Sequence, residues 1–284
     1  MLAAGFGAVL CAAAAFGWLH VRNRTPAVTF TPEPEAVKPA HDANALPTES
    51  AGSLVSPKRI SPEAGFAPIP GEVLDFSATV AKVDNVASLR LKISGETQLG
   101  ANRVWHLQAF AHTRNPLRMV FTLDDQFDSY STPERFTSLQ YEMHLDERGE
   151  RVNSVQRLSA TGRETAPAGT SMVRVIPGTR DPLGLMQYLR SIDWATTREV
   201  KSTVFDGRKL YEVHAQRTGS AKVSVPAGTY ATNAIDIRVY DNGAEMKDAH
   251  FALYIGNDEK RTPALLEATL PFATAKVALT KRSN

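Results

Sequence analysis

The sequence has only one cysteine, Cys11, and it lies in an apolar run at the N-terminus. The rest of the chain therefore forms no disulfide, presents no thiol nucleophile and holds no metal through cysteine. The seven histidines are dispersed. None belongs to an HExxH motif or to a helical pair four residues apart, so we expect no histidine metal site. We expect neither a metal nor a cofactor.

Several enzyme signatures are missing as well. The chain has no G-x-S-x-G of serine hydrolases, no phosphate-binding P-loop and no G-x-G-x-x-G of dinucleotide-binding proteins. Its formal net charge is only +2 over 284 residues, and its lysines and arginines are scattered. Because nucleic-acid-binding proteins carry clustered positive charge, we expect no nucleic-acid partner.

Residues 1–20 contain a long apolar run that, as a helix, would span roughly 28 Å, about the hydrocarbon thickness of a bilayer. We predict that this segment is a transmembrane anchor or a signal segment that contacts the membrane. The positive-inside rule, applied to Arg22 and Arg24 alone, would leave the main domain in the cytoplasm. We expect a periplasmic or other extracytoplasmic domain instead, on the hypothesis that basic residues of a signal lie upstream of this start. Cleavage of the segment stays open.

Residues 21–68 are rich in Pro, Ala, Ser and Glu and include the run TPEPEAVKPA. Such a segment buries too little apolar surface to offset the entropy of ordering it, so we predict a disordered linker. A proline-rich segment can also bind a partner protein. We favour a spacer between the membrane and the folded domain.

Residues 69–284 read as a β domain. Apolar and polar residues alternate in segments that predict antiparallel strands with one solvated face: residues 74–80, 87–93, 105–111, 119–123, 139–145, 235–239, 251–255, 265–270 and 273–279. Residues 124–136 break the alternation and predict a turn or a short helix. The fold class expected is therefore mostly β, a strongly curved antiparallel sheet or open β-barrel with one packed helix.

That helix is predicted over about residues 181–192. Asp181 suits the N-cap and Pro182 the first helical position. An apolar stripe then follows at helical spacing, made of Leu185, Met186, Leu189 and Ile192, while Gln187 and Arg190 fall on other faces. Arg190 suits the C-terminal end of the helix dipole, and it is also a candidate for binding an anion.

Two reversals follow the helix. Asp206-Gly207 predicts a type I′ hairpin that places Phe205 opposite Arg208 and Lys201 opposite Glu212. The alternation then puts five apolar side chains on one face of the hairpin: Val200, Val204, Tyr211, Val213 and Ala215. Residues 225–228, Val-Pro-Ala-Gly, predict a second tight turn, and Asp241-Asn242-Gly243 predicts a third.

The order of several segments resembles a known family. These segments are PGEVLDFSATV, RFTSLQYEM, DPLGLMQYLRSIDW, FDGRKLYEVHAQ, VSVPAGTY and LYIGNDEKRTPALLEATL. Together they resemble DUF3108, a family of exported bacterial proteins of unknown function, over residues 69–279. The resemblance implies a mostly β domain in the cell envelope. It carries no established activity, so it assigns no catalytic residues to this chain.

Candidate site residues come from two observations. Large side chains predicted to point inward, Trp105, Tyr141 and Tyr211, suit a lipid chain or a stacked sugar as well as a dry core, and Arg190 suits an anion. We predict ligand contact at these four positions and name no catalytic or metal-binding residue. The acidic cluster Asp124, Asp125 and Asp128 is more typical of a solvated turn than of a cation site.

The function expected from these features is non-catalytic binding of an envelope component, which would be a lipid, a glycan or a partner protein. The first alternative is an envelope enzyme that uses carboxylates such as Asp124 or Asp258. That alternative needs two acids in one cleft with shifted pKa values. The second alternative is a purely structural assembly factor.

Overall fold

The computed structural model of the chain describes residues 66–162, 167–269 and 274–284. The membrane segment predicted over residues 1–20 and nearly all of the predicted linker lie outside these residues. Within the three described ranges, no helix is long and apolar enough to cross a membrane.

The described part of the chain forms thirteen strands, one α-helix and one 3-10 turn. The elements are β1 Val73–Val80, β2 Val83–Leu99, β3 Asn102–Thr113, η2 Leu117–Met119, β4 Asp124–Ser131, β5 Ser138–Glu147, β6 Glu150–Ser159, β7 Ser171–Arg174, α2 Pro182–Ser191, β8 Glu199–Phe205, β9 Leu210–Val225, β10 Gly228–Asp241, β11 Ala244–Gly256, β12 Pro263–Thr269 and β13 Thr274–Ser283. The mostly β class with one helix is confirmed.

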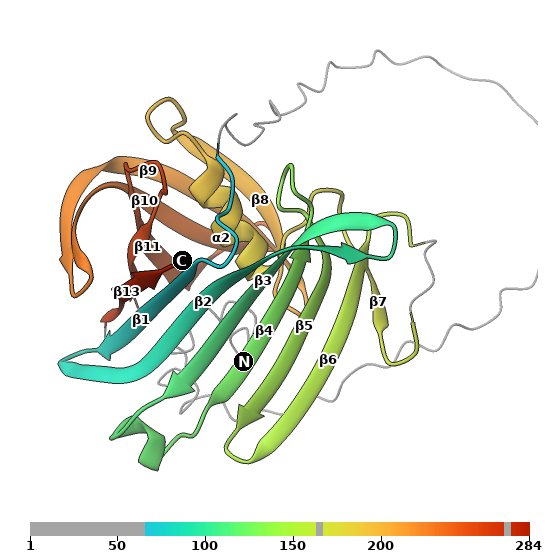
Figure 1. Cartoon of the computed structure of the whole chain (residues 1–284), viewed down its shortest axis with the longest axis horizontal. Helices are drawn as coiled ribbons and strands as arrows, with labels where there is room; N and C mark the ends of the chain where they lie inside the picture. The colour runs from blue at the N-terminus through green and yellow to red at the C-terminus, as the bar shows by residue number, and fades with distance from the viewer. Residues whose placement is uncertain (1–65, 163–166, 270–273) are drawn as a thin grey trace, which may run out of the picture.

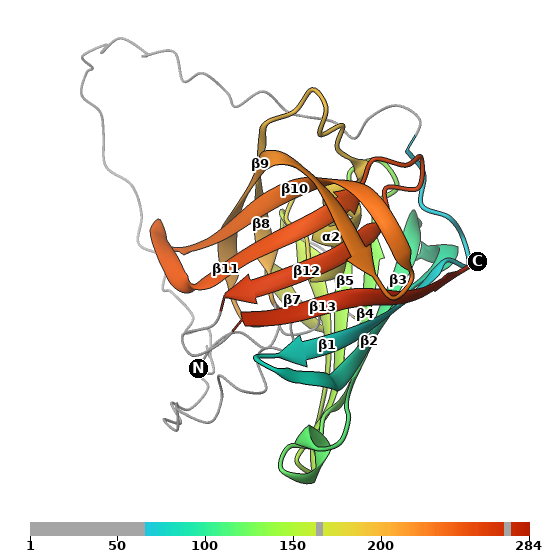
Figure 2. The ribbon, with the colours of Figure 1, turned by 90° about the vertical axis from the view of Figure 1, so that its left-hand side faces the viewer.

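The strands form one 13-stranded sheet in the order β7-β6-β5-β4-β3-β2-β1-β13-β12-β11-β10-β9-β8. Neighbours are antiparallel, except that β6 and β7 are parallel. The pairing of β1 with β13 joins the two halves of the sheet. The sheet curls round α2, with β1–β6 on one side of the helix and β8–β13 on the other (Figures 1 and 2). The expected curved, open architecture is therefore confirmed.

The N-cap predicted for the helix is also confirmed. The Asp181 Oδ1 atom accepts the backbone N–H groups of Leu183 and Gly184, each at 2.8 Å, which satisfies two of the free donors of the first turn. The predicted apolar stripe is buried. The other faces of α2 are buried too, Gln187 and Arg190 included, because α2 packs against strands from both halves of the sheet.

The segment before the helix links two strands that lie far apart in the sheet order. The Ser138 N–H donates to the carbonyl of Thr179 at 3.1 Å, which joins the segment to β5. On its other side, the Arg180 N–H donates to the carbonyl of Thr203 and the Phe205 N–H donates to the carbonyl of Arg180, at 3.0 and 2.8 Å. Residues 179–180 therefore connect β5 to the edge strand β8 and help to close the sheet over α2.

The predicted register of the β8–β9 hairpin is wrong by two residues. Phe205 pairs with Leu210, Thr203 with Glu212 and Lys201 with His214, so the loop has four residues, 206–209. The Asp206 Oδ1 atom accepts the N–H groups of Arg208 and Lys209 at 2.8 and 2.9 Å. This side-chain turn replaces the two-residue type I′ turn.

The face predicted for this hairpin is nevertheless correct, because a slip of two residues preserves the alternation of side chains. Its five apolar residues are all buried: Val200, Val204, Tyr211, Val213 and Ala215. The other predicted turns are confirmed, since Val225 pairs with Gly228 and Asp241 pairs with Ala244.

The segment from residue 119 to 136 also differs from its prediction. Residues 119–123 are not a strand, because Met119 ends the 3-10 turn η2 and is 81% exposed. Residues 124–131 are a strand, β4, in place of the expected turn or short helix. Its inward positions include Ser129 and Ser131, whose hydroxyls lie within 2.9 Å of each other beneath the first turn of α2. Because this buried face carries serines in place of apolar residues, the sequence of β4 lacks the apolar–polar alternation that predicts a strand.

Candidate functional site

Arg190 is held inside the protein by an ion pair. It donates to both carboxylate oxygens of Glu72, at 2.8 and 3.2 Å, and to the carbonyls of Lys260 and Arg261 at 2.9 and 3.1 Å. Its side chain is 2% exposed. Arg190 does not cap its own helix as expected. The Arg261 side chain does so instead, by donating to the Arg190 carbonyl at 3.3 Å.

The three predicted aromatic contacts, Trp105, Tyr141 and Tyr211, lie in the core. They belong to β3, β5 and β9 and are all buried. The Tyr141 ring stacks on Phe127 at 6.3 Å between centroids, and the Lys209 ammonium lies 4.9 Å from the centroid of Tyr211. These three side chains line no part of the groove described below. A ligand contact at these positions stays a prediction.

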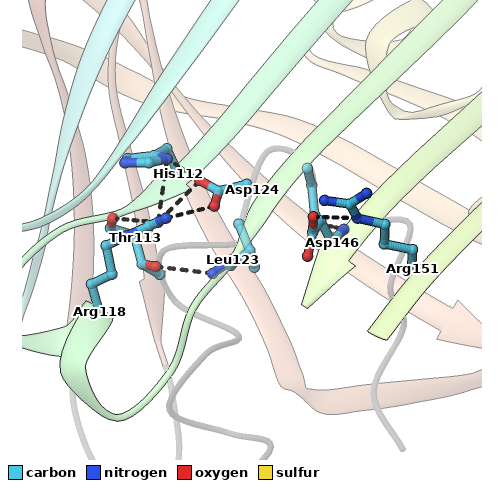
Figure 3. Close-up of polar contacts among 8 residues, drawn as sticks. His112, Thr113, Arg118, Leu123, Asp124, Asp146 and Arg151 are labelled. Atoms are coloured by element: carbon cyan, nitrogen blue, oxygen red, sulfur yellow. Dashed lines mark hydrogen bonds and ion pairs between the residues drawn. The ribbon is translucent and has the colours of Figure 1, made fainter. Parts of the chain in front are cut away.

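The acidic cluster of the sequence is divided between the two faces of β4. Asp124 is exposed and accepts two bonds from Arg118, at 2.7 and 3.0 Å, on the side where His112 also contacts it (Figure 3). The bond from Arg118 lowers the pKa of Asp124. Asp128 instead pairs with His106 at 2.6 Å. No group of three or more potential metal-ligating side chains is found in the part of the chain that the structure describes.

Asp258, the other acid considered for catalysis, holds its own loop together. Its carboxylate accepts the backbone N–H and the hydroxyl of Thr262, both at 3.1 Å. Asp124 lies at the β3–β4 end of the sheet, whereas Asp258 lies between β11 and β12. These two carboxylates have separate partners and form no common acid pair.

A carboxylate pair that the sequence did not indicate lies at Asp125 and Glu147. Asp125 is 3% exposed and accepts the Asp146 N–H at 3.0 Å. Burial raises the pKa of Asp125 to about 7, and the charge of Glu147, to which it is hydrogen-bonded, adds to the rise. Burial also raises the pKa of Glu147. The contact of Leu123 with Glu147 brings the two acids together, which spacing along the chain could not show.

A groove of about 1060 Å³ lies on the outer face of β1, β2 and β3. The exposed or half-buried residues of these strands form its floor, among them Asp75, Arg90 and Phe110. Pro226 of the β9–β10 turn reaches its rim, because the next residue, Ala227, donates its N–H to the Leu279 carbonyl of β13 at 3.1 Å. The groove therefore combines strands from both ends of the sequence.

The groove carries an excess of positive charge. Arg90, Lys92, Arg114 and Lys281 line it, and Asp75 is the one carboxylate among the lining residues. Arg90 donates to Asp75 at 2.7 Å. The remaining cations suit an anionic ligand. The half-buried ring of Phe110 on β3 suits a ligand that also has a flat apolar face.

Comparison with known proteins places the fold. Among solved structures, the chain is similar to a β-barrel-like protein of the domain of unknown function DUF1849 from Brucella abortus, with a TM-score of 0.51 and 9% identity over 77% of this chain and 99% of that chain. A predicted lipoprotein from Parabacteroides distasonis matches with a TM-score of 0.37 and 9% identity, over 77% of this chain and 97% of that chain. The first likeness agrees with the open, barrel-like sheet.

Comparison at the level of sequence gives the family. No curated protein matches the chain. The family model described as protein of unknown function, DUF3108, matches residues 75–280, which is nearly the whole β domain. The chain therefore belongs to the DUF3108 family.

Proposed function

We propose that this chain is a non-catalytic binding protein of the cell envelope, and that its groove binds an anionic, hydroxyl-rich envelope component. The ligand chemistry is that of a phosphorylated lipid headgroup or an acidic glycan. The observation that supports this proposal is the groove over β1–β3, with four cationic side chains against one carboxylate.

Two of the groove cations are available to a ligand. Neither Lys92 nor Lys281 forms an ion pair with any residue in the described ranges, whereas Arg90 is bound to Asp75. An ammonium group gains more from a bound anion when no internal carboxylate competes for it. Phe110 and the Ser88 hydroxyl, both in the lining, add a surface that suits the face and the hydroxyls of a sugar.

The cellular location is part of the same proposal. The apolar segment of residues 1–20 and the linker after it support a domain tethered to, or released from, the outer side of the cytoplasmic membrane. The DUF3108 resemblance, which implies export, supports the same location.

Catalysis by carboxylates has weaker support. The acid pair with raised pKa values, Asp125 and Glu147, lines no part of the groove. Asp125 is buried on the inner face of β4 and is 3% exposed. We therefore favour binding over catalysis.

The test is a binding assay with four probes: vesicles of phosphatidylglycerol, vesicles of phosphatidylcholine, polygalacturonate and dextran. The wild-type protein is expected to bind phosphatidylglycerol or polygalacturonate and neither neutral probe, and the probe bound separates the lipid source from the glycan source. A Lys92→Ala/Lys281→Ala double variant should bind at least about tenfold more weakly.

The matched control is Lys201→Ala/Lys222→Ala, which removes the same charge from exposed positions outside the groove. Its affinity should equal that of the wild type. Equal weakening in both double variants would mean that net charge alone drives binding. Failure of all four probes would favour the structural assembly factor.

A further inference from the structure

Arg180, the residue before the helix cap, is buried, and no acidic side chain among the described residues pairs with it. It is 8% exposed. Its Nε atom donates to the Arg135 carbonyl at 3.0 Å, and its Nη1 atom donates to the Ser202 hydroxyl at 2.9 Å and to the Gly178 carbonyl at 3.3 Å. All three acceptors are neutral. The guanidinium carbon lies 3.6 Å from the ring centroid of Tyr188 on α2.

Arg190, ten residues further along the chain, is a buried arginine that has a counter-ion. It is bound by the carboxylate of Glu72, whereas no carboxylate in the described part of the chain pairs with Arg180. A buried charge without a counter-ion is costly. Burial lowers the pKa of Arg180 to about 10, and the charge of Arg135 acts in the same direction.

Arg135 adds a second cation at the same place. It is exposed and belongs to the loop between β4 and β5, whose backbone already binds Arg180. The charges of Arg180 and Arg135 both act on the Tyr188 hydroxyl, whose pKa is nevertheless raised by burial. Neither the Arg135 guanidinium nor the Tyr188 hydroxyl has a hydrogen-bond partner among the residues described.

We propose that Arg180, Arg135 and Tyr188 form a binding site for an oxyanion, the phosphate or carboxylate group of a ligand. The Nη2 atom of Arg180 has no acceptor within the described residues, and the forked guanidinium of Arg135 suits two oxygens of one anion. The Tyr188 hydroxyl supplies a neutral donor. None of the three residues lines the groove over β1–β3, so this site is independent of the proposed function.

The test uses inorganic phosphate and acetate as probes, titrated at constant ionic strength. Binding is followed by calorimetry and by the side-chain Nε–H signals of arginine in ¹H–¹⁵N spectra. We expect saturable binding of at least one probe with a shift of the Arg180 signal, and the stronger probe identifies a phosphate or a carboxylate ligand. Arg135→Ala should weaken binding at least about tenfold, as expected for loss of a charged hydrogen bond.

Two further variants complete the design. Tyr188→Phe keeps the ring under Arg180 and removes only the hydroxyl, so it should weaken binding by a smaller factor. Arg103→Ala removes an exposed arginine that pairs with Glu96, and its affinity should be unchanged. The proposal is overturned if neither probe binds saturably, or if Arg135→Ala and Arg103→Ala bind equally well.

Discussion

The guanidinium of Arg190 binds the carboxylate of Glu72 although 118 positions separate them in the chain. Arg282 of β13 reaches the same carboxylate at 2.7 Å. The pair therefore ties α2 to the start of β1 and to the last strand. Segments that carry the DUF3108 resemblance, Pro-Gly-Glu72, Tyr-Leu-Arg190 and the loop around Lys260, meet at this point. Their contacts hold α2, the start of β1 and the last strand together.

Loss of Glu72 should destabilise the domain strongly. Glu72→Ala removes the counter-ion of the buried Arg190 and of the half-buried Arg282, which should lower the free energy of unfolding by about 3–5 kcal/mol. Urea denaturation measures this change. Glu96→Ala, which breaks the exposed pair with Arg103, should cost at most about 1 kcal/mol. Similar losses for the two variants would contradict the role given to the buried pair.

Gly184 allows the first turn of α2 to lie close to the β4–β5 loop. A Cβ atom there would lie 2.7 Å from the Phe136 carbonyl oxygen and 2.9 Å from the Ser138 hydroxyl. Helix propensity alone favours Gly184→Ala by about 1 kcal/mol, but overpacking against backbone costs about 1–3 kcal/mol. We expect net destabilisation in urea, and unchanged or higher stability would show that the loop can move away. Gly219→Ala, with no neighbour within 4 Å, is the control.

The β8–β9 hairpin offers a test of which face is buried. Val213→Asp places a charge at a position that is 1% exposed and should lower stability by more than about 3 kcal/mol. Glu212→Ala, on the solvated face of the same strand, should change it by less than about 1 kcal/mol. Thermal denaturation compares the two variants, and equal melting temperatures would refute the assignment of faces.

The Asp125–Glu147 pair should make stability depend on pH. Because the pKa of Asp125 is raised from 3.8 to about 7 on folding, its protonated form stabilises the fold fully below about pH 4. This stabilisation is lost as the pH rises through about 7. Asp125→Asn cannot ionise and should therefore show a smaller fall in melting temperature between pH 5 and pH 8 than the wild type.

The control for this pH dependence is Asp84→Asn, at an exposed position near the β1–β2 turn. It should retain the wild-type fall in melting temperature. The role assigned to Asp125 fails if Asp125→Asn shows the same pH dependence as the wild type.

The proposed location predicts the behaviour of reporter fusions. An alkaline phosphatase joined after Pro70 should be active, because that enzyme requires an oxidising compartment. A green fluorescent protein that is fluorescent only in the cytoplasm, joined at the same place, should stay dark. The opposite pair of results would place the domain in the cytoplasm.

Local patterns in the sequence were sufficient for much of the fold. Alternation located most strands, and the chemistry of Asp181-Pro182 located the start of α2. Features that depend on distant partners were not predictable from these patterns. Gln187 and Arg190 fall on polar faces of an isolated helix, yet both are buried because the two halves of the sheet enclose α2.

The carboxylate pair and the groove also depend on residues that are distant in the sequence. The carboxylate pair needs Asp125 and Glu147 on adjacent strands, and the groove needs Lys92 and Lys281 from opposite ends of the domain. No spacing in the sequence indicates either arrangement. The prediction of the β8–β9 register was wrong for a local reason. The Asp206 side chain accepts hydrogen bonds from the backbone of the turn, and the loop therefore has four residues instead of two.

The β1–β13 pairing also determines the order in which the domain can be completed. β1 can pair with β2 early, because the two strands are adjacent in the sequence. Its other edge has no partner until β13, about 200 residues later, is present, as the hydrogen bond from Thr280 to Asp75 across 205 positions shows. Contacts of such long range slow folding and keep a strand edge open to other chains in the meantime. A chain that emerges with its N-terminus first therefore cannot complete the pairing of β1 until its last strand has arrived.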